Sequence, residues 1–326
     1  MSLPSFQLLR PRTLDEAIAM MAKHPGEIKV VAGGTDLLPS MKQKLFAPPY
    51  VMDLRGAGEL RGIRSVAGRG VEIGALTTLS AVEHSPIIRR DYPVLYDAVK
   101  TVASPVLRNM GTIGGNICLD TRCLWYNQSL QWRKSCGFCL KKDGNLCHVA
   151  PGGSFCWAAF SGDTPPALLC LEAELEIAGC DGVRHTPLSE FYVNDGIVRL
   201  HLASDEIVTR VFLPERSAGW RGSYYKLRMR GSIDYPLAGV AVAMRMKAGQ
   251  VGDARVAITA LNPAPHLVKD AELHLVGKVP DEELAEQAGE LVARTAKPLT
   301  TSALTPEYRR EIVKVFAKRA VLACLN

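Results

Sequence analysis

The chain has 326 residues, of which 47% are hydrophobic and 22% charged, a composition typical of a globular protein with two or three packed domains. The formal net charge is +6, and the Lys and Arg residues are scattered outside any recognisable nucleic-acid module, so we expect no nucleic-acid partner. No apolar run approaches the roughly 20 residues that span a bilayer, and the first residues lack the pattern of a signal peptide. The sequence therefore predicts a cytoplasmic protein without membrane contact.

The first hundred residues alternate helical and strand patterns. A capping box that begins at Thr13 predicts a helix, which the His-Pro-Gly sequence at residues 24–26 ends. A buried-strand pattern at residues 28–32 leads directly into Gly-Gly-Thr-Asp at residues 33–36. The other elements expected here are strands at 51–54 and 71–73 and helices near 79–84 and 94–102. Such alternation indicates α/β or α+β layers.

A second glycine turn, Thr-Ile-Gly-Gly-Asn at residues 112–116, precedes a segment of a different kind. Residues 118–160 are rich in cysteine, have little apolar periodicity and contain three of the four tryptophans. A long segment without regular structure is usually functional rather than a simple connector. Regular structure is expected to resume with a helix at 165–171 and a strand at 173–178.

The last third of the chain has the pattern of a small α+β domain, with its boundary near residues 214–222. Its expected strands lie at 223–229, 238–246 and 254–261, and its expected helices at 280–293 and 306–325. The second helix has Thr305 as its N-cap and Pro306 at its first position, where the missing amide hydrogen of proline costs nothing.

The two glycine turns have the chemistry of a dinucleotide site. Adjacent glycines let the backbone approach a pyrophosphate closely, and their amides, with the Thr35 hydroxyl, can donate to phosphate oxygens. Neither turn has the G-x-G-x-x-G spacing of a nicotinamide site. Either sequence alone is better explained as an ordinary tight turn. Two such turns occur, each flanked by threonine and a further polar residue, so a tight turn and a dinucleotide site explain the pattern equally well.

Five motifs at and beyond these turns are similar to the FAD-binding medium subunits of the xanthine dehydrogenase and carbon monoxide dehydrogenase family, the molybdenum hydroxylases. They lie at residues 31–36, 108–116, 161–167, 225–230 and 234–238, and the resemblance covers the chain apart from residues 118–160. It implies an α+β fold, with a two-part FAD-binding domain and a small C-terminal α+β domain that has a three-stranded sheet. The implied domains are residues 1–56, residues 57–216 interrupted by a loop at 118–160, and residues 217–326.

The resemblance also implies the residues that contact FAD. They are Val31, Ala32, Gly33, Gly34, Thr35, Asp36, Leu37, Thr112, Gly114, Gly115, Asn116, Asp120, Asp163 and Lys226. Two of them have ordinary alternatives. Asp163 is also suited to cap the helix that follows it, and Lys226 to be a solvated lysine on a strand.

The nine cysteines indicate a metal or redox centre, because six of them fall within 39 residues and the cytosol disfavours disulfides. Cys123, Cys139, Cys147 and Cys156 are separated by 16, 8 and 9 positions. Their surroundings resemble the insert of the β subunits of 4-hydroxybenzoyl-CoA reductases, which implies that these four cysteines bind a [4Fe–4S] cluster. Four thiolates also suit structural zinc, although zinc sites usually use closer Cys-x-x-Cys pairs. The cysteines expected only to pack are Cys118, Cys136, Cys170, Cys180 and Cys324.

Charge in the insert is mostly positive. Its basic residues are Arg122, Arg133, Lys134, Lys141 and Lys142, against a single acidic residue, Asp143, between residues 122 and 148. A run of charge is usually a solvated face, and it is also suited to steer an acidic electron carrier.

The resemblance implies an electron-transfer subunit that supplies no catalytic residue. Electrons would pass from ferredoxin through the cluster to FAD, then to a [2Fe–2S] small subunit and a molybdenum cofactor large subunit. There 4-hydroxybenzoyl-CoA would be dehydroxylated to benzoyl-CoA, as in aromatic degradation, in a heterohexamer of two heterotrimers. Two alternatives stay open, another molybdenum hydroxylase with a different substrate and a zinc-stabilised scaffold that has lost flavin.

Overall fold

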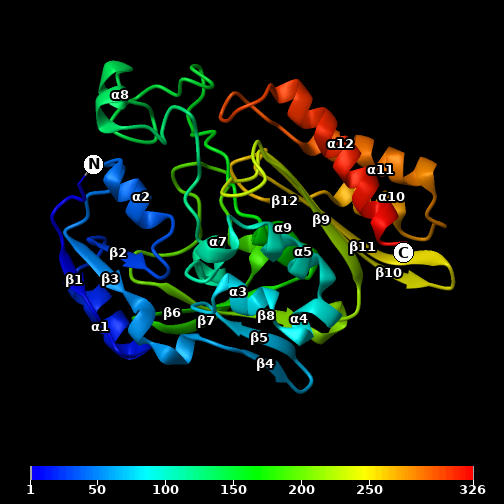
Figure 1. Ribbon diagram of the computed structural model, residues 1–326, viewed down its shortest axis with the longest axis horizontal. Coiled ribbons are helices and arrows are strands. Elements are labelled where there is room, and N and C mark those ends of the chain that lie inside the picture. The colour runs from blue at the N-terminus through cyan, green and yellow to red at the C-terminus, as the bar shows by residue number, and fades with distance from the viewer. Residues whose placement is uncertain (1, 326) are drawn as a thin grey trace.

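The computed structural model describes residues 2–325, which form three sheets with helices packed against them (Figure 1). The first sheet is parallel, in the order β1-β3-β2. Its strands are β1 (Gln7–Leu9), β2 (Ile28–Val31) and β3 (Tyr50–Asp53), joined by helices α1 (Leu14–Lys23) and α2 (Leu37–Lys42). Helix α1 begins at the predicted capping box, where the Thr13 side chain accepts a hydrogen bond from Glu16 N at 3.2 Å. The turn between β2 and α2 lies at the carboxyl edge of this sheet.

The second sheet is antiparallel, with strand order β4-β5-β8-β6-β7. Its strands are β4 (Ile63–Val66), β5 (Gly70–Gly74), β6 (Glu174–Gly179), β7 (Gly182–Pro187) and β8 (Ile207–Pro214). The helices of this part are α3 (Leu79–Glu83), α4 (Pro86–Asp91), α5 (Pro93–Thr101), α6 (Pro105–Arg108), α7 (Ile113–Ile117) and α9 (Thr164–Cys170). Buried side chains of α5, α7 and α9 join those of β5, β6 and β8 in one core.

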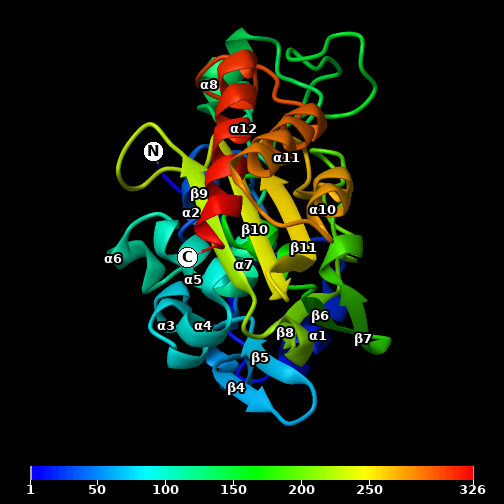
Figure 2. The same cartoon turned by 90° about the vertical axis from the view of Figure 1, so that its right-hand side faces the viewer.

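The third sheet, of order β12-β11-β10-β9, is antiparallel and covered by helices on one face (Figure 2). Its elements are β9 (Arg221–Leu227), β10 (Ala238–Lys247), β11 (Gln250–Thr259), β12 (His266–Leu267), α10 (Lys269–Leu275), α11 (Glu282–Thr295) and α12 (Pro306–Ala323). Strand β10 is buried on both faces: Val240 and Val242 pack among the three helices, whereas Ala241 and Ala243 join the core of the second sheet. The small residues let the two layers approach closely.

The expected α+β class is confirmed. Helix α11 begins two residues after the expected position, because Asp281 caps it by accepting from Leu284 N at 2.7 Å. The expected three-stranded C-terminal sheet gains a fourth strand, β12, which is only two residues long and so leaves no alternating pattern in the sequence. Helix α12 begins as predicted, with the Thr305 side chain accepting from Tyr308 N at 3.2 Å. Within the described chain, no helix has the length and apolar character that crossing a membrane requires.

Residues 118–160 form an insert that projects at the top of Figure 1. Its one helix is α8 (Leu130–Ser135), capped by the Ser129 side chain. Apart from α8 and isolated bridges, the insert has no helix or strand within the described residues, as its sequence predicted.

Candidate functional site

The first glycine turn presents a row of free backbone donors. Strand β2 ends at Val31 and α2 begins at Leu37, so the intervening residues must reverse direction within a few positions. Four successive amides, from Gly33 to Asp36, have no hydrogen-bond acceptor within residues 2–325. Gly34 has φ +73°, which glycine adopts without strain. This turn can therefore donate several amide hydrogens to one anionic ligand.

Both turns were expected to offer backbone amides to a phosphate. In the second turn, however, the glycine amides already donate hydrogen bonds within the protein. Gly114 N donates to Ala75 O at 2.9 Å, and Gly115 N donates to the Thr112 hydroxyl at 3.1 Å, which makes Thr112 the N-cap of α7. Asn116 Oδ1 accepts from both the backbone N and the hydroxyl of Thr164, at 3.0 and 2.7 Å. The second turn can therefore contribute only its shape and side chains to a dinucleotide site, whereas the first turn can contribute amide donors.

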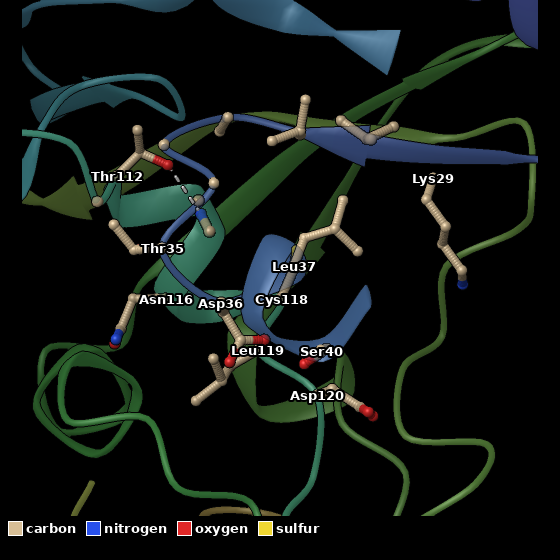
Figure 3. Close-up of a pocket in the computed structure, with 18 of the residues that line it drawn as sticks. Lys29, Thr35, Asp36, Leu37, Ser40, Thr112, Asn116, Cys118, Leu119 and Asp120 are labelled. Atoms are coloured by element: carbon tan, nitrogen blue, oxygen red, sulfur yellow. Dashed lines mark hydrogen bonds between the residues drawn. The ribbon is translucent and has the colours of Figure 1, made fainter. Parts of the chain in front are cut away.

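The first turn packs against residues 110–111, which lead directly into the second turn. A Cβ atom added at Gly33 would lie 1.9 Å from Met110 O, so only glycine allows this approach. Together they line a cavity of about 840 Å³, the flavin cavity, which has the size expected for a large cofactor (Figure 3). Thirteen of the fourteen residues expected to contact FAD line this cavity. Lys226 is the exception.

Lys226 lies behind Asp163 and holds it in place. Its Nζ donates to Asp163 Oδ2 at 2.9 Å and to Thr101 O at 3.0 Å, while the Tyr224 hydroxyl donates to Asp163 Oδ1 at 2.9 Å. The Lys226 side chain is 2% exposed, so it is not a solvated strand lysine, and the Asp163 side chain makes no cap bond to α9. Burial raises the pKa of Asp163 above its usual range, although Lys226 and Tyr224 favour its charged form. Lys226 is therefore not a solvated lysine, and Asp163 occupies the N-cap position of α9 without capping it through its side chain, while the contact of both residues with FAD stays a prediction.

Asp36 joins the first turn to two other parts of the chain. Its Oδ1 accepts from the Tyr235 hydroxyl at 2.7 Å and from Arg122 at 3.2 Å. The Arg122 guanidinium also lies over the Tyr235 ring, 3.9 Å from its centroid. Burial, followed by the nearby Asp36 charge, raises the pKa of Tyr235. The insert and the C-terminal part thus meet at the rim of the flavin cavity.

Several lining residues were not expected from the sequence. Lys29 on β2 reaches the flavin cavity (Figure 3), where burial and the nearby Arg199 lower the pKa of its ammonium. A lysine inside an apolar strand was a signal that could have found it. Ser40, residues 197–200 and residues 202–204 also line the cavity, and the irregular sequence of residues 197–204 has no periodic pattern to mark it.

The four cysteines expected to bind metal surround one cavity inside the insert, the cysteine cavity. Cys123, Cys139, Cys147 and Cys156 all line it, and each is 6–9% exposed. Cys136, three positions before Cys139, does not line it. The structure therefore brings together the widely spaced set and leaves out the close Cys-x-x-Cys partner.

A backbone amide points at one of these sulfurs: Ala158 N donates to the sulfur of Cys156 at 3.4 Å. Burial raises the pKa of Cys123 to about 12 and that of Cys156 to about 11, so both are neutral thiols at pH 7 unless a metal ion displaces the proton. Amide donors to sulfur are a feature that tunes iron–sulfur clusters.

The cysteine cavity does not gather its ligands around a point. No three or more His, Cys, Asp or Glu side chains in residues 2–325 form a group that could hold a metal ion. His148 also lines the cavity, but its Nε2 donates to Phe138 O at 2.6 Å and its ring stacks on Trp125 at 4.3 Å. The histidine is thus part of the wall.

The insert is anchored to three other segments. Arg133, 1% exposed, donates to the carbonyl oxygens of Gln43 and Lys44, just after α2. Leu124 N donates to Thr301 O at 2.8 Å, and Gly196 N donates to Cys156 O at 2.8 Å. These contacts hold the loop against both the flavin-binding part and the C-terminal part.

The basic residues of the insert do not form the expected solvated or steering face. Arg133 is buried against backbone carbonyls, Arg122 is paired with Asp36, and the Lys141 side chain is 6% exposed. Acceptors in neighbouring segments and in the insert itself pair with these cations, which a count of charges does not reveal. Only Lys134 and Lys142 of this group remain at the surface.

The remaining cysteines have separate places in the fold. Cys118 lines the flavin cavity, and Cys170 and Cys324 are buried in the two large cores, as expected for packing residues. Cys136 is half-buried beside α8. The expectation for Cys180 was wrong: it is exposed in the turn between β6 and β7, outside the paired residues of the strands.

Two family models match the chain. Residues 4–216 match the FAD-binding domain of molybdopterin dehydrogenases, and residues 223–324 match the C-terminal domain of carbon monoxide dehydrogenase flavoproteins. Among curated relatives, the carbon monoxide dehydrogenase medium chain of Hydrogenophaga pseudoflava is 28% identical over 98% of this chain and 97% of its own length. The aldehyde oxidoreductase FAD-binding subunit of Escherichia coli is 31% identical over 83% of this chain and 86% of its own length.

Solved structures agree with these matches. The carbon monoxide dehydrogenase of Hydrogenophaga pseudoflava superposes with a TM-score of 0.81 at 28% identity, covering 100% of this chain and 99% of that chain. The quinoline 2-oxidoreductase of Pseudomonas putida superposes with a TM-score of 0.79 at 26% identity, with the same coverage. From the glycine turns, the flavin cavity and these matches together, the chain belongs to the FAD-binding medium subunits of the molybdenum hydroxylase family, whose members are oxidoreductase subunits.

Proposed function

We propose that this chain is the FAD- and [4Fe–4S]-carrying electron-transfer subunit of a molybdenum enzyme of the 4-hydroxybenzoyl-CoA reductase type. The observation that carries the proposal is that four buried cysteines surround one cavity, in an insert that begins at the wall of the flavin cavity. Family membership accounts for the flavin. The cysteine cavity accounts for a second redox centre.

The flavin cavity fits FAD in its size and in its donors. The free amides from Gly33 to Asp36 would hold the diphosphate, while the second turn closes the cavity from the other side. Bound FAD exchanges one or two electrons, which lets it join one-electron and two-electron carriers. We assign no catalytic residue to the chain, because the carboxylates of Asp163 and Asp36 are engaged by neighbouring side chains.

A [4Fe–4S] cluster suits the cysteine cavity better than zinc. Four buried cysteines line one cavity, and a backbone amide donates to the sulfur of Cys156. These features suit a cluster, whose four irons each take one cysteine, and the wide spacing of the four residues is unlike the close cysteine pairs of zinc sites. The intact flavin cavity beside it also argues against a zinc-stabilised scaffold that has lost FAD.

The proposed partners are a molybdenum cofactor large subunit and a [2Fe–2S] small subunit, in a heterohexamer of two heterotrimers with ferredoxin as donor. The relatives named medium chains or medium subunits support a multi-subunit enzyme. Reductive dehydroxylation of 4-hydroxybenzoyl-CoA is the proposed reaction. Another substrate is the alternative, because the names of the relatives include carbon monoxide, nicotine and nicotinate enzymes at similar identity.

We also propose three structural domains, at residues 1–56, 57–216 with the insert at 118–160, and 217–326. The division of the strands among three sheets supports this proposal, since β3 ends at Asp53 and β9 begins at Arg221.

Serine substitution of individual cysteines tests the cluster. Each of Cys123→Ser, Cys139→Ser, Cys147→Ser and Cys156→Ser should lower the iron content of the purified complex, because each removes one thiolate ligand. Cys136→Ser is the matched control, since it changes the same insert three positions from Cys139 but outside the cavity. FAD should stay at about one per chain in all five variants.

Metal and flavin analysis decides the outcome. About four irons per chain beyond those of the [2Fe–2S] subunit support the proposal, and zinc in their place refutes the cluster. Loss of iron in Cys136→Ser equal to that in Cys139→Ser would show that the cysteine set is wrong. Formation of benzoyl-CoA from 4-hydroxybenzoyl-CoA with reduced ferredoxin tests the reaction separately. An iron-loaded complex that leaves this thioester unchanged would retain the electron-transfer role and refute the substrate.

A further inference from the structure

The flavin cavity and the cysteine cavity share a wall. Asp120 lines the flavin cavity and Lys141 lines the cysteine cavity, and Lys141 Nζ donates to Asp120 Oδ1 at 2.8 Å. Figure 3 shows Asp120 beside Leu119 among the residues around the flavin cavity. One ion pair therefore joins the two cavities.

Lys141 is fixed in this wall by all of its donors. Its ammonium group donates to Asp120, to the Thr121 hydroxyl at 2.6 Å and to Gly196 O at 2.5 Å, which uses the three hydrogens that a lysine carries. Its side chain is 6% exposed and lies over the Tyr126 ring, 4.7 Å from the centroid. The positive charge therefore cannot swing into solvent.

The charge balance of the cysteine cavity makes this lysine distinctive. Of the residues that line the cavity in the described chain, Lys141 is the only lysine or arginine. Four cysteine thiolates around a cluster would place a net negative charge beside it, and a buried pair of charges is screened little by solvent. Asp120 has a second cation, Arg199, at 3.6 Å, so it keeps a partner when Lys141 changes.

A plain anchor for the loop is the alternative role of Lys141. The insert already has such anchors in Arg133 and in the Leu124 backbone, and neither of those two contacts faces the cysteine cavity from the flavin side. An anchor acts through shape and hydrogen bonds, whereas a charge in the shared wall acts through its sign. The two roles therefore predict different responses to charge changes of opposite sign.

We propose that Lys141 is a positioning residue that couples the two cofactor sites electrostatically. This inference rests on the proposed function, because it requires an iron–sulfur cluster in the cysteine cavity. The fixed positive charge stabilises an added electron on the cluster and so raises its reduction potential. Lys141 and Arg199 both hold Asp120 as an anion in the wall of the flavin cavity, and Lys141 is the closer cation, at 2.8 Å against 3.6 Å, so its loss weakens that support and also changes FAD binding.

The test compares four variants of the purified complex, Lys141→Met, Lys141→Arg, Asp120→Asn and Lys142→Met. Redox titration followed by electron paramagnetic resonance gives the cluster potential, and flavin fluorescence gives the FAD dissociation constant. Lys141→Met should lower the equilibrium constant for one-electron reduction of the cluster at least tenfold, a shift of about 59 mV. Asp120→Asn should shift the potential in the opposite direction, and Lys141→Arg should keep most of the wild-type value.

Lys142→Met is the matched control, because the Lys142 side chain is 39% exposed and pairs with Asp143 at 3.2 Å. It should leave both cofactors unchanged, whereas Lys141→Met should alter the potential and the FAD dissociation constant together. Equal potentials in the two methionine variants would overturn the inference. A shift of the same sign in Lys141→Met and Asp120→Asn would also overturn it, as would a change in only the cluster potential or only the FAD dissociation constant.

A second outcome separates this inference from the proposed function. A wild-type complex without iron would refute both. An iron-loaded complex whose potential is the same in Lys141→Met as in the wild type would refute this inference alone.

Discussion

Replacement of Gly33 by alanine tests whether the flavin cavity depends on contact between its two turns. The new Cβ atom would lie 1.9 Å from Met110 O and 2.9 Å from Gly111 N. Both are backbone atoms, which cannot rotate away as a flexible side chain does. To restore an ordinary contact of about 3.4 Å, the turns must separate by about 1.5 Å.

That separation moves the free amides of the first turn away from the second turn. Inserting a methyl group into a packed site costs about 1–3 kcal/mol. If the FAD-bound state bears this cost, binding weakens about 5- to 150-fold, since 1.4 kcal/mol is a factor of ten. We therefore expect Gly33→Ala to lose FAD on dilution while the rest of the chain stays folded.

Three other glycines provide a graded comparison. A Cβ at Gly114 would lie 2.8 Å from the Cβ and 2.9 Å from the carbonyl oxygen of Ala75, so Gly114→Ala should also weaken FAD binding. At Gly115 the only close atom is the Thr112 hydroxyl at 3.0 Å, which predicts a smaller loss. Gly58 has nothing within 4 Å, so Gly58→Ala is the control.

Equilibrium titration of the flavin-free complex with FAD, followed by fluorescence quenching, measures all four variants. The expected order of dissociation constants follows the contact distances, with Gly33→Ala the weakest binder and Gly58→Ala equal to the wild type. Tight binding by Gly33→Ala would refute the reasoning. Equal losses in all four variants would refute it too, because the effect would then be unrelated to contact between the turns.

Two further predictions concern lysines. Lys226→Met should destabilise the chain by about 3–5 kcal/mol, because it leaves the buried Asp163 carboxylate without its cation; the denaturant midpoint of flavin release measures this, and adding Asp163→Asn should recover part of the loss. The double charge reversal Lys134→Glu with Lys142→Glu should slow reduction by ferredoxin at low salt and lose its effect at high salt, because charges are screened over about 10 Å at 0.1 M. Stopped-flow rates that ignore both the reversal and the salt would exclude these lysines as a docking surface.

Local spacing was enough to predict the parts of the site that depend on short stretches of chain. The first glycine turn follows a strand and precedes a helix, so its position at a sheet edge followed from the pattern alone. The four cysteines that line one cavity were singled out for another reason, since their spacing and neighbours carried a resemblance, and their role as metal ligands stays a prediction. Thirteen of the fourteen residues expected to contact FAD line one cavity, because most of them belong to the first and second glycine turns.

Partners far apart in the sequence were not predictable in this way. Lys226 and Asp163 are 63 positions apart, and only the packing of α9 against the sheet that contains β9 makes the lysine a buried support behind the aspartate. The burial of Lys141 and Arg133 has a similar origin, because Gly196, which accepts from Lys141, and residues 43–44, which accept from Arg133, lie outside the insert and meet it only after folding. A charge count treats all these lysines and arginines alike, whereas tertiary structure decides which of them remain in water.

The position of the insert is as informative as its cysteines. It leaves the fold at Cys118 and returns near Ser161, and both residues line the flavin cavity. Asp120 lines the flavin cavity and Cys123 the cysteine cavity, and three residues of extended chain span at most about 11 Å. The metal centre proposed at Cys123 would therefore lie near the flavin by covalent geometry alone. The same loop placed in the exposed turn between β6 and β7 would offer the same ligands at the surface, without that proximity, so this location favours electron transfer over a purely structural metal.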